Sequence, residues 1–195
     1  MQPILIIMLA TATSLPLGLW LRRNLATLSY RRAEEADLPE PGPRWWVVWA
    51  SSLAIGGLAT AAALSQDPLM YLPLVPLAAT GPWLAGVDFD VLRIPNSTLV
   101  PTAASTLFAV VCVSTATHDW QILIVPVAAA VVTGAAFTAV HVATKGGIGF
   151  GDVKLAAVAG LAVGPLGVAA AWLGVITGSA AGLVWAKVGR RIGPI

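Results

Sequence analysis

The sequence predicts an all-α, polytopic bundle of transmembrane helices. Of its 195 residues, 57% are hydrophobic and only 10% are charged, and the mean hydropathy is +0.84. An average soluble domain carries about 25% charged residues, so this chain lacks the polar surface that would cover it in water. The composition therefore excludes a disordered chain, a nucleic-acid-binding protein and an ordinary cytosolic protein. The positions of the apolar segments and of the basic residues support the same prediction.

Apolar segments follow one another along most of the chain. A membrane-spanning helix needs about 20 predominantly apolar residues. Seven candidate segments lie at residues 2–21, 46–64, 69–87, 97–117, 121–142, 153–164 and 166–186. The sixth is too short to cross alone, so it is either a half-helix or joined to the seventh at Gly164-Pro165. We therefore expect six or seven spans in a single transmembrane domain, residues 1–195. The first segment lacks the basic stretch that precedes a cleavable signal core, so we expect it to remain as an anchor.

The eleven basic residues all fall on one side of a seven-span bundle. Five lie in the connection 22–44, and the other six are Arg93, Lys145, Lys154, Lys187, Arg190 and Arg191. The connections on the opposite side contain none. Lysine and arginine concentrate on the cytoplasmic side of membranes. We therefore expect an N-terminus outside, a cytoplasmic C-terminus, a cytoplasmic loop at 22–44 and a multi-pass location in the cytoplasmic (inner or plasma) membrane.

Three aspartates lie at the ends of apolar segments on that same side. Asp88 and Asp90 end the third segment, and Asp152 begins the sixth. A carboxylate at the edge of the apolar zone is costly, so it indicates a functional site unless it has a partner. Two carboxylates brought together share one proton, as in aspartic proteases, where one activates water and the other polarises the scissile carbonyl. This chemistry needs no metal or other cofactor.

Ion pairing is the alternative interpretation of these acids. Asp90 could pair with Arg93 three residues later, and Asp152 could lie beside Lys154 or Lys145. The spacing alone does not decide between pairing and catalysis.

A glycine-rich segment precedes Asp152. Four of the six residues from 146 to 151 are glycines, which disfavours a stable helix there. Gly149 and Gly151 flank the bulky Phe150, and such a segment lets another backbone approach closely. A substrate strand could therefore present its peptide bond to Asp152. A phosphate-binding loop is the competing interpretation, but no Walker-type Lys-Ser/Thr pair follows and the acid would repel phosphate.

The sequence Gly-Gly-Ile-Gly-Phe-Gly-Asp-Val-Lys-Leu at 146–155 resembles the GxGD signature of type IV prepilin peptidases, which are membrane aspartic proteases. Their second signature is an aspartate that ends an apolar helix, with a Pro-Asn pair seven residues on. Asp88 followed by Pro95 and Asn96 fits it. The resemblance implies that Asp88 and Asp152 are the catalytic pair and that Asp90 is dispensable for catalysis. It also implies that Gly149, Phe150, Gly151, Lys154, Pro95 and Asn96 shape the site or bind substrate.

The resemblance also implies the reaction and the partner. Such enzymes cleave a short basic leader from prepilin or prepilin-like precursors, after a glycine that precedes an apolar helix. Many bacterial members carry two CxxC zinc-binding pairs in the first cytoplasmic loop and N-methylate the product. The loop 22–44 here has no cysteine. We therefore expect a short, peptidase-only member without N-methyltransferase activity, acting on a precursor within the lipid bilayer. The oligomeric state is not determined by the sequence.

Other functions and roles stay open at this point. The same acids could carry protons in a proton-coupled transporter, or the chain could be a non-catalytic pilus or secretion assembly factor. His141, which ends the fifth segment, could adjust the acids or act as a hydrogen-bonded packing residue. The acidic group in the first loop, Glu34, Glu35, Asp37 and Glu40, could attract a basic leader or simply be solvated.

Overall fold

The computed structural model describes residues 2–167 and 169–170. Within these residues every regular element is a helix and no strand occurs. The α-helices are α1 (Gln2–Ala26), α2 (Trp46–Leu64), α3 (Val75–Val91), α4 (Asn96–Thr117), α5 (Gln121–Ala143) and α6 (Phe150–Val163). Three short 3-10 helices are η1 (Ala33–Glu35), η2 (Pro68–Leu74) and η3 (Gly164–Leu166). The all-helical prediction is confirmed for the part of the chain that is described.

Four helical segments in the described residues are long and apolar enough to cross a membrane. They are Trp46–Leu64, Pro68–Val91, Asn96–Thr117 and Gln121–Ala143. Each matches a segment predicted from the sequence, and Pro68–Val91 runs through η2 into α3. Helix α6 has 14 residues, which is shorter than the roughly 20 that a span needs. The predicted seventh span lies almost wholly outside the described residues, so the total of six or seven spans stays a prediction.

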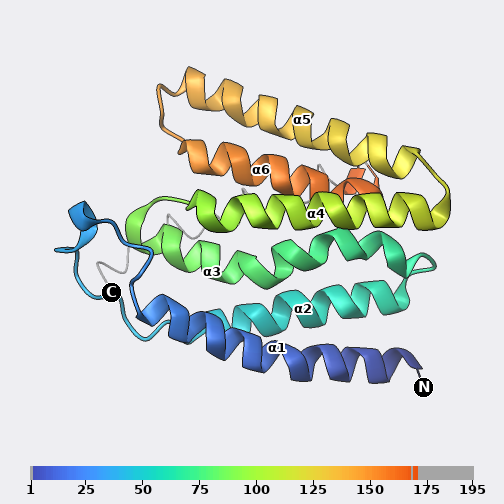
Figure 1. The fold of residues 1–195 in the computed structure, drawn as a ribbon, viewed down its shortest axis with the longest axis horizontal. Helices are drawn as coiled ribbons and strands as arrows, with labels where there is room; N and C mark the ends of the chain where they lie inside the picture. The colour runs from blue at the N-terminus through green and yellow to red at the C-terminus, as the bar shows by residue number, and fades with distance from the viewer. Residues whose placement is uncertain (1, 168, 171–195) are drawn as a thin grey trace.

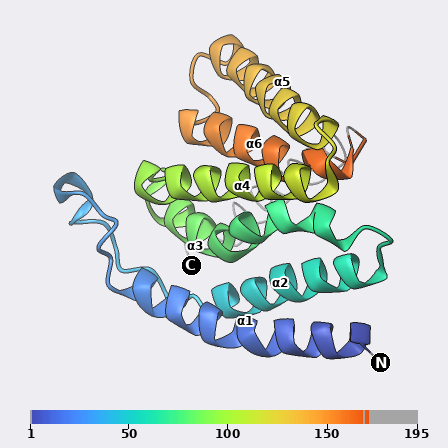
Figure 2. The same ribbon diagram turned by 45° about the vertical axis from the view of Figure 1, so that its right-hand side comes forward.

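The helices lie side by side in the order α1, α2, α3, α4, α6, α5 (Figures 1 and 2). Chain order is broken once, because α6 returns between α4 and α5. The connections α1–α2, α3–α4 and α5–α6 lie together at one end of the bundle, on the left in Figure 1. The connections α2–η2 and α4–α5 lie at the other end, as does the N-terminus. The first of these ends carries the basic residues of the described connections, and it is called the basic end below.

The best-packed core lies toward the basic end of the bundle. It joins five helices through Leu21, Leu25, Val47, Trp83, Leu84, Val87, Leu99 and Val158, together with Ile94 from the α3–α4 connection. Trp83 also donates its indole N–H to the Asn24 side chain at 2.9 Å, which ties α3 to α1. Core residues from α3, α4 and α6 therefore fix the helix ends that carry the candidate site.

The outward faces of the bundle are apolar. Phe108 is 71% exposed, Val131 is 65% exposed and Ile124 is 64% exposed. Side chains of this kind on an outer face suit contact with lipid hydrocarbon rather than water. On the inner side, a Cβ added at Gly160 of α6 would lie 2.8 Å from the Ala129 carbonyl oxygen of α5. The absence of a side chain at Gly160 lets these two helices pack closely.

Candidate active site

Asp88 lies in the last turn of α3. The helix ends because Leu92 adopts a left-handed conformation (φ 49°), and its N–H donates to the Asp88 carbonyl oxygen at 2.8 Å. The buried neighbours Val87 and Leu84 face the core, whereas Asp88 itself is half-buried. The chain therefore leaves α3 directly beside this carboxylate.

Asp152 lies in the first turn of α6. Gly149 is the N-cap residue, and the Asp152 N–H donates to its carbonyl oxygen at 3.0 Å. A carboxylate is favourable at a helix N-terminus because the free N–H groups make that end positive. The sequence predicted an irregular segment up to residue 151, and this is partly wrong because Phe150 and Gly151 already belong to α6.

Both aspartates line one cavity of about 670 Å³ at the basic end. The α3–α4 connection and the start of α6 form much of its wall, and Asp88 is close enough to Asp152 for their charges to interact. Among the described residues, neither carboxylate has a salt bridge or a side-chain hydrogen bond. The suggested pairing of Asp152 with Lys154 or Lys145 is not found there. Two carboxylates without a cation partner in the described part of the chain thus line the same cavity.

Two direct contacts join the segments that carry the two aspartates. The Lys154 ammonium of α6 donates to the Asn96 side-chain oxygen at the start of α4, at 3.0 Å. A Cβ added at Gly151 would lie 3.1 Å from the Ile94 Cβ and 3.3 Å from the Ile94 nitrogen. Pro95, the N-cap residue of α4, also lines the cavity. The predicted site residues therefore meet around the cavity, although Gly151 makes room for this chain's own backbone.

The glycines at 149 and 151 differ in how much space they have, and this gives a testable contrast. Gly151→Ala is expected to shift α6 from Ile94 by a few tenths of an ångström and to lower activity, because close-packed backbone gives way poorly. A Cβ at Gly149 would meet only the Asp152 carboxylate, at an ordinary 3.5 Å. Gly149→Ala is therefore expected to cost less activity. Equal losses in the two variants, measured as cleavage per folded molecule, would contradict this reading.

The side chains of Phe150 and His141 contact each other beside the cavity. The Phe150 side chain is 54% exposed, and its ring lies 5.8 Å from the His141 ring and 5.0 Å from the Lys154 ammonium. His141 Nδ1 lies 2.6 Å from the Ile148 carbonyl oxygen. The histidine thus holds the glycine-rich loop, as the packing interpretation predicted. No group of three His, Cys, Asp or Glu side chains in the described residues could hold a metal ion.

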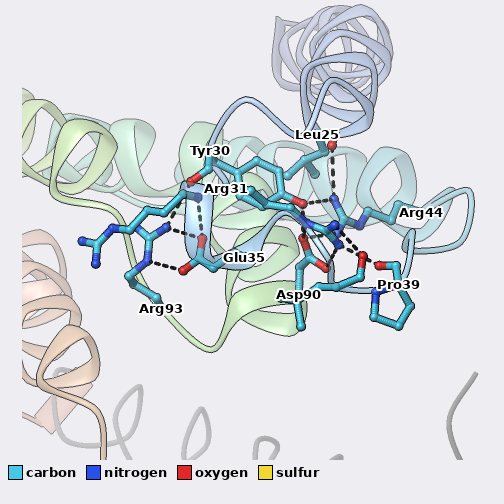
Figure 3. Close-up of polar contacts among 10 residues, drawn as sticks. Leu25, Tyr30, Arg31, Glu35, Pro39, Arg44, Asp90 and Arg93 are labelled. Atoms are coloured by element: carbon cyan, nitrogen blue, oxygen red, sulfur yellow. Dashed lines mark hydrogen bonds and ion pairs between the residues drawn. The ribbon is translucent and has the colours of Figure 1, made fainter.

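Asp90 is the centre of a buried ionic cluster, shown in Figure 3. Arg31 binds its carboxylate in a bidentate manner, at 2.9 Å from Nε and 2.8 Å from Nη2. The Tyr30 hydroxyl donates to the same carboxylate at 2.5 Å, and Arg44 Nη2 lies 3.4 Å away. The Arg31 and Asp90 side chains are each 6% exposed and Arg44 is 9% exposed. The cluster fastens the α1–α2 loop to the end of α3.

The suggested pairing of Asp90 with Arg93 is wrong. Arg93 instead forms a salt bridge with Glu35 of η1 at 2.9 Å and donates to the Tyr30 carbonyl oxygen at 3.0 Å. Asp90 and Arg93 lie on either side of the left-handed turn at Leu92, and both contact the α1–α2 loop, Asp90 at the Tyr30 hydroxyl and Arg93 at the Tyr30 carbonyl oxygen. No sequence signal marked Tyr30, Arg31 or Arg44 beyond their place in a basic loop.

The Glu35–Arg93 contact should make the docking of the loop sensitive to acid. Hydrogen bonds from Arg93, and then from the Arg32 backbone N–H, lower the pKa of Glu35 from its usual value. A group whose pKa is lower in the folded state stabilises that state above its unfolded pKa, about 4.3 for glutamate. This contribution is lost as the pH falls through the folded-state value.

Thermal unfolding in detergent, measured from neutral pH down to below the pKa of Glu35, tests this expectation. Wild type should be more stable than Glu35→Gln near neutral pH, and the difference should vanish at low pH. Glu34 is exposed, so Glu34→Gln serves as the matched control and should show no such pH-dependent difference. A stability gap for Glu35→Gln that persists in acid would exclude the ionised contact as its cause.

Comparison with known proteins identifies the family to which this site belongs. The model of the type IV leader peptidase family matches residues 76–186, which is more than half of the chain. The chain belongs to the type IV leader peptidase family. It is therefore a membrane protease of the prepilin peptidase kind. Comparisons with curated proteins and with solved structures found no significant match.

The type IV leader peptidase match begins in α3 and includes the motif segments around both Asp88 and Asp152. Helix α1, the α1–α2 loop and α2 precede the matched region. Much of the ionic cluster around Asp90 therefore comes from a part of the chain outside the family match, since Tyr30, Arg31 and Arg44 all lie in that loop.

Proposed function

We propose that this protein is a membrane-embedded aspartic endopeptidase that removes the basic leader from prepilin-like precursors. The observation that carries the proposal is the pair of carboxylates, Asp88 and Asp152, that line one cavity without a cation partner among the described residues. Asp90, two residues from Asp88, forms salt bridges with Arg31 and Arg44. This contrast supports Asp88 as the first catalytic residue and gives Asp90 a structural role.

The proposed reaction needs one water molecule and one shared proton. One carboxylate takes a proton from water as the water oxygen attacks the carbonyl carbon of the scissile peptide. The other carboxylate, protonated, donates a hydrogen bond and then its proton as the tetrahedral intermediate forms. Collapse of this intermediate breaks the C–N bond, and the departing amine receives the proton that the first carboxylate took from water. A hydroxyl of the intermediate returns its proton to the second carboxylate as the new carboxyl group forms. The pair again holds one proton, so no cofactor is consumed.

The cytoplasmic face of the membrane is the proposed place of cleavage. The basic connections lie at the end of the bundle where α3 ends and α6 begins (Figure 1), and these helix ends carry Asp88 and Asp152. Cytoplasmic loops are enriched in lysine and arginine. A precursor whose apolar helix lies in the bilayer would then present its leader at this end. Of the four loop acids proposed to attract a basic leader, Glu35 is already bound by Arg93, so Glu34, Asp37 and Glu40 remain for that role.

The proton-coupled transporter is the less well supported alternative. A transporter pathway would need ionisable groups that connect the two sides of the membrane. The three aspartates of interest lie at the basic end of the bundle, where α3 ends and α6 begins. A non-catalytic assembly factor would have no need for two unpaired carboxylates in one cavity.

The direct test is cleavage of a purified precursor by the purified protein. Protein in lipid vesicles is incubated with a prepilin-type precursor, and the products are identified by mass spectrometry. The expected result is a single cut after the glycine that ends the basic leader, without methylation of the new N-terminus. An intact precursor, with a protein shown to be folded, would contradict the proposal.

A further inference from the structure

Leu92, in the α3–α4 connection, combines two unfavourable features. Its backbone is left-handed, with φ 49°, a conformation that glycine adopts freely and that a side chain makes costly. Its side chain is also 86% exposed, the largest exposed fraction among the large apolar side chains of the described residues. Neither feature helps the fold, because a glycine or an asparagine would end α3 with less strain.

The position of Leu92 at the candidate active site suggests a functional reason for its strained, exposed side chain. Leu92 lines the cavity that holds Asp88 and Asp152. Phe150, which is 54% exposed, lines the same cavity from the start of α6. Gly151 brings the segments carrying these two side chains into contact at Ile94. Two exposed apolar side chains from separate elements thus border the cavity that contains the two carboxylates.

Lipid contact explains Leu92 less well than it explains the other exposed leucines. Leu53 and Leu64 are 76% and 79% exposed, but both lie within the candidate span of α2. Leu92 lies just after Val91, the last residue of the candidate span Pro68–Val91, and is followed directly by Arg93 with its ionic contact to Glu35. An apolar side chain held in a strained turn beside a charged network is better explained by a ligand that covers it.

We propose that Leu92, together with Phe150, is a specificity-determining contact for the apolar segment of the substrate that follows the scissile bond. This inference rests on the proposed peptidase function, since it assigns a binding role at the same cavity. Burial of Leu92 by the bound precursor would compensate the strain of the free enzyme. The enzyme would then distinguish its substrates from other proteins by the apolar residues that follow the scissile bond, in addition to any recognition of the leader.

The variant Leu92→Gly separates this role from a structural one. Glycine relieves the left-handed strain, so the melting temperature should stay the same or rise. Loss of the apolar contact should lower kcat/KM by roughly 10- to 150-fold, the change that corresponds to burying one leucine side chain. Leu92→Met, which keeps an apolar side chain at the same backbone position, should retain most of the activity. A merely structural role would make activity follow stability in all variants.

His118 provides the matched control. It ends α4 in the same left-handed conformation (φ 54°), at the end of the bundle opposite to the cavity (Figure 1). His118→Gly should therefore change the melting temperature in the same direction as Leu92→Gly and leave kcat/KM for the precursor unchanged.

A double-mutant cycle with the substrate tests direct contact. The first large apolar residue after the cut is replaced by alanine, and kcat/KM is measured with wild type and with Leu92→Gly. We expect the two losses to be less than additive, because both changes remove the same contact. Additive losses, or no loss with Leu92→Gly, would overturn the inference. Failure of wild type itself to cleave, or cleavage by Asp88→Asn, would instead refute the proposed function.

Discussion

Asp88→Asn and Asp152→Asn are each expected to lower kcat for precursor cleavage by about a thousandfold or more, the usual scale for losing a general acid or base. Asparagine keeps the shape of the side chain but can neither take a proton from water nor pass one to the amine. The double variant should be no worse than the single variants, because the two carboxylates act as one unit. The measurement is single-turnover cleavage with enzyme in excess.

Folding is the control for these two variants. Asp88 and Asp152 have no salt bridge among the described residues, so each variant should unfold at or above the wild-type temperature. Removal of one of two facing carboxylates relieves repulsion between them. A variant that is folded, binds precursor and still cleaves at the wild-type rate would exclude its aspartate from catalysis.

Asp90→Asn is expected to produce the opposite pattern. The substitution leaves Arg31 and Arg44 buried without their carboxylate, and breaking such a pair costs about 3–5 kcal/mol. For a chain of this length that corresponds to a melting temperature lower by roughly 6–20 °C. The sequence predicted substantial activity for this variant. With the cluster known, we expect that activity only in the fraction of molecules that remains folded.

The comparison that isolates the Asp90 cluster uses three variants at one temperature. Glu34→Gln removes a loop charge that is exposed, so its stability should match that of wild type. Asp88→Asn removes a carboxylate from the same helix end and should abolish cleavage without loss of stability. If Asp90→Asn were as stable as wild type yet inactive, Asp90 and not Asp88 would be the first catalytic aspartate.

Much of the fold could be predicted from the sequence because a helix that crosses the bilayer needs about 20 consecutive apolar residues. Four predicted segments coincide with the four helical segments that are apolar and long enough to span. The short α6 was also anticipated, since only about a dozen apolar residues follow the glycine-rich segment. The spatial order of the helices in the bundle could not be predicted in the same way. The insertion of α6 between α4 and α5 depends on which faces pack, and the apolar faces of these helices look alike in sequence.

The candidate aspartates could be found because each lies at the end of an apolar segment within a motif of fixed spacing. That property is local, so the linear order of residues reveals it. The same reasoning gave the wrong partner for Asp90, because it considered only nearby cations. Arg31, the true partner, lies 59 residues away in the chain, in a polar loop whose path has no sequence signature.

The sequence by itself determined the membrane class, the helical segments and the two aspartates at their ends, because hydrophobic length and motif spacing are one-dimensional. Only the tertiary structure decided which of the three aspartates is bound by arginines within the described residues, since ion pairing depends on distances between segments far apart in the chain. The same is true of Gly151 against Ile94 and of the exposed, left-handed Leu92. Close backbone contact and turn geometry are properties of the packed helices, and residue type alone does not specify them.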